Sequence, residues 1–143
     1  MVSIMLDMNG INNSILAEYA SYLESQNIDY RSGQGFSVRF ELQNADVAFI
    51  KVEINGKTVT LFNYFGTCYT GIRNTNRVAK VLKEKYPTYT IWIEKYTTFE
   101  IDVEEKFSFR SIANLHKHVC KMAAVVDEGA GIGKEMLGEA FDR

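Results

Sequence analysis

The chain has 143 residues, of which 46% are hydrophobic and 13% are aromatic, and it contains one proline. These values exclude a disordered or collagen-like chain and predict one domain built around one core. The 16 basic and 18 acidic residues are interspersed and leave a net charge of −2, so we expect neither nucleic acid nor a membrane surface as a partner.

The two cysteines and the first residues bear on the compartment. Cys68 and Cys120 each lack a nearby second cysteine, which argues against a disulfide framework and fits a reducing compartment. Residues 1–11 lack the basic and long apolar regions of a signal peptide, and no run approaches the roughly 20 apolar residues of a membrane helix. We therefore expect a cytoplasmic protein.

A helix is predicted first. Leu16, Tyr19 and Leu23 recur at the spacing of an amphipathic helix, after possible N-cap side chains at residues 12–14. Asn27 is a plausible left-handed residue at its C-terminal end.

Strands follow. Residues 38–42 alternate between apolar and polar side chains, and residues 47–54 and 57–65 are expected to pair across a tight turn at Asn55-Gly56. That turn would place Val52 opposite Val59 on one face and turn Phe49 and Phe62 to the other face.

A second helix and a second hairpin are predicted next. Asn74 or Thr75 could cap a helix that Pro87 ends, and residues 89–94 and 99–104 alternate as strands. Their apolar sides coincide only if the loop between them has an odd number of residues, which would place Trp92 beside Glu100.

The last predicted helix begins at Ser108 or Ser111, and its apolar residues recur at three and four up to Val126. The glycines at 129, 131 and 133 are interpreted as a helix stop, because the flanking acidic residues do not match a phosphate-binding loop. Residues 1–128 would then form a single α+β domain, and residues 129–143 a glycine-rich C-terminal tail outside the cooperative core.

The order of these elements predicts an α+β fold, with an antiparallel sheet of five or six strands and three helices packed mainly on one face. The basic side of the second helix is interpreted as a solvated face. Its cationic residues are Arg73, Arg77, Lys80, Lys83 and Lys85.

Neither a metal nor a cofactor is expected. His116 and His118 lie two apart on a predicted helix and point in different directions, so they do not form a metal chelate and are expected at the boundary of the core. Glu100, Asp102 and Glu104 share one strand face, which we interpret as solvated in preference to a cation site.

Four aromatic residues form the predicted binding surface. The inferred pairing places them on the sheet face opposite the main apolar stripe, and large exposed apolar patches mark interfaces. They are Phe49, Phe62, Tyr64 and Trp92. The alternative is that this face is covered by the N-terminal segment, where Val2, Ile4 and Leu6 alternate, or by the C-terminal tail.

The segment from residue 72 to residue 77, with Asn74 and Asn76, leads through the second helix to Tyr86-Pro87 and the next strand. This succession resembles the bacterial YbjN family, which shares the fold of type III secretion chaperones, over residues 15–126. The closely spaced asparagines and the glycine-rich tail depart from it. The resemblance implies a non-enzymatic regulator or chaperone-like binder, often dimeric, with no catalytic residues to carry over.

The sequence thus predicts a non-enzymatic protein-binding module whose partner is another protein or a second copy. The alternative is a small enzyme or ligand-binding domain that uses Glu100, Asp102 and Glu104 with His116 or His118. That alternative requires the acidic and histidine groups to converge within about 3 Å of a shared atom.

Overall fold

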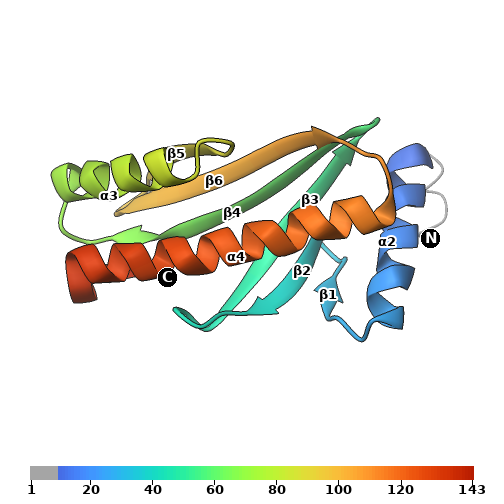
Figure 1. Cartoon of the computed structure of the whole chain (residues 1–143), viewed down its shortest axis with the longest axis horizontal. Helices are drawn as coiled ribbons and strands as arrows, with labels where there is room; N and C mark the ends of the chain where they lie inside the picture. Colours follow the sequence, from blue (N-terminus) through green and yellow to red (C-terminus); the bar gives the residue numbers. More distant parts are fainter. Residues whose placement is uncertain (1–9) are drawn as a thin grey trace.

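The computed structural model describes residues 10–143, and side chains from residue 14 onward, so the alternating Val2, Ile4 and Leu6 lie outside the described residues. Three helices and seven strands form the predicted α+β fold (Figure 1), with more strands than the five or six expected. The helices are α2 (Gly10–Ser25), α3 (Ile72–Lys85) and α4 (Ile112–Leu137). The strands are β1 (Tyr30–Arg31), β2 (Phe36–Glu41), β3 (Val47–Asn55), β4 (Thr58–Cys68), β5 (Thr90–Lys95), β6 (Phe99–Ser108) and β7 (Phe141–Asp142), and a short 3-10 helix, η1 (Gly138–Ala140), precedes β7.

All strand pairs are antiparallel, in the order β1-β2-β3-β4-β6-β5, and β7 pairs with the end of β4. The five long strands are those that the alternating sequence predicts. β1 and β7 have two residues each and bring the total to seven. Segments this short carry no detectable alternation, so the sequence pattern misses them.

The tight turn between β3 and β4 differs from the prediction by one position. Asn55 pairs with Thr58, so Gly56 and Lys57 occupy the turn, with Gly56 at φ 64°. A glycine at the first central position meets the only positive φ that this turn needs, whereas a turn at Asn55-Gly56 would need two. Val52 therefore pairs with Leu61 instead of Val59. The shift is an even number of residues, so every side chain keeps its predicted face.

The β5–β6 hairpin has the predicted odd loop length but a different register. Lys95 pairs with Phe99 across a loop at residues 96–98, and Trp92 pairs with Asp102 instead of Glu100. Trp92 therefore lies one residue further from the loop than expected.

The predicted helix ends at Asn27 and Ser111 are confirmed, whereas the predicted starts of the first two helices are wrong. Helix α2 begins at Gly10, before the caps expected at residues 12–14. Asn27 has a φ of 59°, and the Ser111 hydroxyl accepts a hydrogen bond from the Asn114 backbone N–H at 3.1 Å. Helix α3, however, begins after Gly71 and not at Asn74 or Thr75. Thr75 is buried, and its hydroxyl donates to the Gly71 carbonyl at 2.8 Å, so it lies inside the first turn.

The interpretation of the last glycines as a helix stop is also wrong, because α4 continues to Leu137. A Cβ atom at Gly129 would overlap the ring of Phe65, and one at Gly133 would overlap the ring of Phe141. These glycines therefore let the helix backbone approach two aromatic rings. How much residues 129–143 contribute to stability stays a prediction, but the burial of Phe141 leads us to expect the opposite of a dispensable tail.

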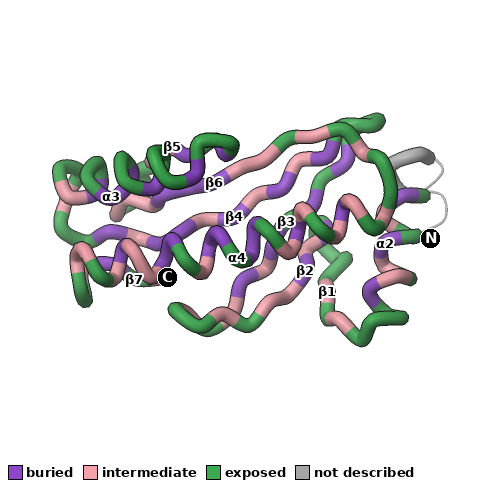
Figure 2. Tube along the Cα trace, viewed as in Figure 1, coloured by how far each residue is buried: buried purple, intermediate pink, exposed green. Residues whose placement is uncertain are grey.

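The helices lie on one face of the sheet. Tyr19 of α2 stacks on Phe36 with ring centroids 5.7 Å apart, and Phe65 stacks on Tyr86, which follows α3, at 6.0 Å while also contacting Gly129 of α4. Figure 2 shows the buried positions recurring along the strands and along the inner sides of these helices. One continuous apolar core results.

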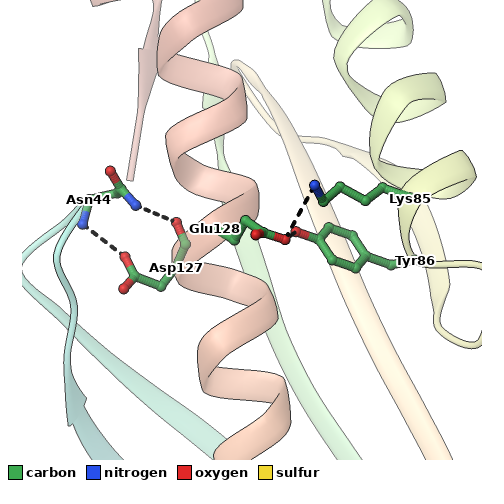
Figure 3. Close-up of polar contacts among 5 residues, drawn as sticks. All are labelled: Asn44, Lys85, Tyr86, Asp127 and Glu128. Atoms are coloured by element: carbon green, nitrogen blue, oxygen red, sulfur yellow. Dashed lines mark hydrogen bonds and ion pairs between the residues drawn. The ribbon is translucent and has the colours of Figure 1, made fainter.

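Acidic side chains near the middle of α4 attach it on two sides (Figure 3). The Asp127 carboxylate accepts hydrogen bonds from the backbone N–H groups of Gln43 at 3.1 Å and Asn44 at 2.8 Å, in the β2–β3 loop. The neighbouring Glu128 accepts from the Tyr86 hydroxyl and pairs with Lys85 at 3.6 Å. Helix α4 is thus held between that loop and the end of α3.

Candidate functional site

The sheet face opposite the helices carries Phe49, Phe62, Tyr64 and Trp92, which we call the aromatic face. Phe62 follows the buried Leu61 and precedes the buried Asn63, as expected when alternate residues point to opposite faces. All four side chains are half-buried. In the described part of the chain, α2, α3 and α4 all contact the other face of the sheet, so no helix packs over these four side chains.

The four rings have different surroundings. Phe62 and Trp92 contact each other, with ring centroids 6.0 Å apart and planes inclined by 42°. The guanidinium of Arg31 lies 3.7 Å from the centroid of Phe49, and that of Arg143 lies 4.4 Å from the centroid of Tyr64. Two rings are therefore covered by cations of the chain itself, and two pack on each other.

A shallow open groove of about 320 Å³ crosses β2, β3 and β4 beside these rings. Phe49, Phe62 and Tyr64 line it together with Lys51. Its lining combines aromatic and polar groups.

The strands β3 and β4 separate near Tyr64, and the end of the chain fills the gap. The Asn63 amide donates to the Phe49 carbonyl at 2.7 Å, and the Arg143 guanidinium donates to the Val47 carbonyl at 3.2 Å and to the Asn63 side-chain oxygen. The N-terminal and C-terminal segments were both considered as covers for the aromatic face. The C-terminal segment reaches Tyr64, and it leaves Phe62 and Trp92 half-buried.

The acidic strand face is only partly solvated, which corrects the sequence interpretation for one residue. Glu100 and Glu104 are half-buried, but Asp102 is only 2% exposed and its Oδ1 atom has no hydrogen-bond partner. Burial, together with Glu100 and Glu94, raises the pKa of Asp102 to about 8. Tyr64 and Trp92 lie opposite Asp102 on the two neighbouring strands and cover it. The alternation of the sequence alone does not reveal this burial of Asp102.

The histidines do not join this acidic face. His118 lies 3.1 Å from Glu105 and stacks on Phe107, and both of these β6 residues point to the helix-covered face. Glu100, Asp102 and Glu104 point to the other face. The acidic and histidine groups that the alternative function requires are therefore on opposite sides of the sheet.

One histidine has a polar environment that the sequence interpretation missed. His116 contacts the Tyr19 hydroxyl at 2.8 Å and the Cys120 sulfur at 3.3 Å. The four-residue spacing of His116 and Cys120 on a helix could have indicated their contact. Burial lowers the pKa of His116 and raises that of Cys120, which favours a neutral pair over a reactive thiolate.

Two other expectations from the sequence concern charge and metal binding. The cationic residues of α3 are exposed, as predicted for a solvated face. Among residues 10–143, no group of three or more histidine, cysteine or acidic side chains is arranged to hold a metal ion. Within the same range, no helix combines the length and the apolar character needed to span a bilayer.

Sequence comparisons identify no relative, whereas the fold has a known counterpart. No protein-family model and no curated protein matches the chain. Its structure is similar to the crystal structure of YbjN from E. coli, named as a candidate transcription regulator, with a TM-score of 0.61 over 81% of this chain and 91% of that one. The two sequences are 8% identical, so the likeness establishes a YbjN-like fold and nothing finer.

Proposed function

We propose that this chain is a non-enzymatic protein-binding module of a chaperone-like or regulatory kind, and that it binds through the aromatic face. The observation that carries the proposal is the one-sided packing of the helices, which leaves four aromatic side chains half-buried on the other side of the sheet. Aromatic residues are enriched where protein interfaces concentrate their binding energy.

Phe62 and Trp92 are the central pair of this surface. Full burial of such a side chain contributes roughly 1.5–3 kcal/mol, and part of that gain is already realised in the half-buried state. Two or three such rings could still hold a modest complex together once the cost of association is met. The fold likeness is compatible with this class of function, because the similar protein is named as a candidate transcription regulator.

Association measurements with a double variant would test the proposal. Phe62→Ser combined with Trp92→Ser should weaken self-association in sedimentation velocity, or capture of partners from a lysate of the source organism, by at least about tenfold. The matched control is Tyr69→Ser with Val81→Ser, which removes two exposed apolar side chains that lie outside the aromatic face. It should bind like the unchanged protein.

Circular dichroism must show that both double variants remain folded. Equal association of the unchanged protein and the Phe62→Ser, Trp92→Ser variant would refute the aromatic face as the binding surface. In that case the exposed basic side of α3 becomes the next candidate.

A further inference from the structure

The aromatic face has one half that is already covered by cations and one half that is not. Arg31 lies over Phe49 and Arg143 over Tyr64. Within the described part of the chain, no cation lies over Phe62 or Trp92, and residues 1–13 contain neither lysine nor arginine. The pair formed by Phe62 and Trp92 is therefore the half that lacks the cation present at the other rings.

Carboxylates surround Trp92 on the same face. Its indole N–H donates to Glu94 at 3.1 Å, and Asp102 lies opposite it on β6. Glu100 lies opposite Glu94 on the same pair of strands. Among the described side chains, no lysine or arginine lies within ion-pair distance of Glu94, Glu100 or Asp102. These three carboxylates thus have no ion-pair partner among the described residues, and the charge of Arg143 acts on Glu100 only from beyond ion-pair distance.

Other acidic residues of the same face have lysine partners. Glu53 lies 3.0 Å from Lys51, and Glu104 lies 3.9 Å from Lys106. On this face, Glu53 and Glu104 thus have ion-pair partners, whereas the carboxylates around Trp92 have none in the described part of the chain.

Asp102 provides an independent sign of a missing partner. Its side chain is buried, and its Oδ1 atom accepts no hydrogen bond. A buried polar atom without a partner costs free energy, so such atoms in folded proteins call for an explanation. Arg143, the nearby cation, donates instead to Val47 and Asn63.

We propose that the cluster of Trp92, Glu94, Glu100 and Asp102 binds the guanidinium group of an arginine in the protein partner. This inference rests on the proposed function and names the chemistry of the partner at that surface. A guanidinium is planar, so it can stack flat on the indole ring while its in-plane N–H groups donate to carboxylate oxygens, whereas a lysine ammonium has no plane that stacks on the ring.

The charged surroundings of Asp102 make the binding depend on pH. Burial together with Glu100 and Glu94 raises the pKa of Asp102 to about 8, so its carboxyl is protonated at neutral pH. The other groups near it are the Tyr64 hydroxyl from β4, the Tyr96 hydroxyl from the hairpin loop and the Arg143 guanidinium over the Tyr64 ring, and none of them forms a hydrogen bond with its Oδ1 atom. A bound cation favours the ionised carboxylate, so binding should release a proton.

The chain contains a single tryptophan, and that residue is Trp92, so its fluorescence reports on the proposed site directly. The probe is a blocked peptide of alternating glycine and arginine, compared with the same peptide carrying lysine. The arginine peptide should shift the emission saturably, and its affinity should rise by about tenfold or more between pH 6 and pH 9. Glu100→Gln should weaken binding by about tenfold, and Asp102→Asn should also remove the pH dependence.

Glu53→Gln is the matched control, because Glu53 lies on the same face but pairs with Lys51. The proposal is overturned if Glu53→Gln weakens binding as much as Glu100→Gln, or if the lysine peptide binds as tightly as the arginine peptide. Partner capture separates this outcome from failure of the proposed function. If Glu100→Gln leaves capture intact while Phe62→Ser with Trp92→Ser abolishes it, the aromatic face binds protein and the arginine site is wrong.

Discussion

The two faces of this sheet are built from the same strands but differ in how closely other elements approach them. On the covered face, glycines of α4 remove the Cβ atoms that would overlap Phe65 and Phe141. On the open face, half-buried rings alternate with charged side chains, and one oxygen of the buried Asp102 carboxyl has no hydrogen-bond partner. The comparison indicates that close backbone approach serves packing on one side, while the other side keeps rings and carboxyl groups that no helix covers.

The largest expected effect comes from removing the last part of the covered face. Truncation after Glu128 deletes the end of α4 and β7, including the buried Phe141, and exposes the core around Phe65. Loss of one large buried ring alone costs about 3–5 kcal/mol, so we expect a loss above about 4 kcal/mol or failure to fold. Urea denaturation followed by circular dichroism measures the loss.

Two point variants keep this test informative if the truncated chain does not fold. Phe141→Ala should lose about 3 kcal/mol, whereas Glu139→Ala, at an exposed position, should change stability by less than about 0.5 kcal/mol. Unchanged stability of Phe141→Ala would show that the C-terminal segment contributes little, in agreement with the expectation from the sequence.

The next largest effect comes from a substitution on the open face, Asp102→Asn, which should raise the free energy of unfolding instead of lowering it. The folded pKa of Asp102 is about 8 against an ordinary value of 3.8, so its carboxyl binds a proton more tightly in the folded state. Stability from this group is fully present below about pH 4 and is lost as the pH rises toward 8. Asp102→Asn should therefore stabilise the protein by about 2–4 kcal/mol at pH 8 and have little effect at pH 4.

Denaturation midpoints measured from pH 4 to pH 9 would test this expectation. Glu104→Gln is the control, because Glu104 lies on the same strand face but is half-buried beside Lys106. A constant stability difference between Asp102→Asn and the unchanged protein across this range would contradict the raised pKa. A variant that gains stability and loses arginine binding would show that the open face trades stability for function.

A smaller effect distinguishes the glycines of α4 from one another. Gly129→Ala forces a methyl group into the Phe65 ring and should cost about 1–3 kcal/mol. Gly131→Ala meets only the end of the Asn44 side chain, at 2.9 Å, and a helical alanine gains up to about 1 kcal/mol over glycine, so its net effect should be near zero. Thermal melts of both variants measure the difference, and equal values would remove close packing as the reason for Gly129.

The sequence by itself determined the α+β class, the five long strands and the faces of the residues in the predicted strand segments. Alternation of apolar and polar side chains is a local property, and it survived the error in the turn at Gly56 because the register moved by an even number of residues. It therefore also identified Phe49, Phe62, Tyr64 and Trp92 as members of one face.

Only the tertiary structure decided what local patterns leave open. The glycines of α4 looked like a helix stop because low helix propensity is visible in sequence, whereas the rings of Phe65 and Phe141 that require them come from distant strands. Likewise, Asp102 looked solvated because its burial depends on Tyr64 and Trp92 from two neighbouring strands, and Arg143 reaches Tyr64 only through the pairing of β7 with β4. Contacts between residues far apart in the chain set burial, and burial sets both the packing of a glycine and the pKa of a carboxyl.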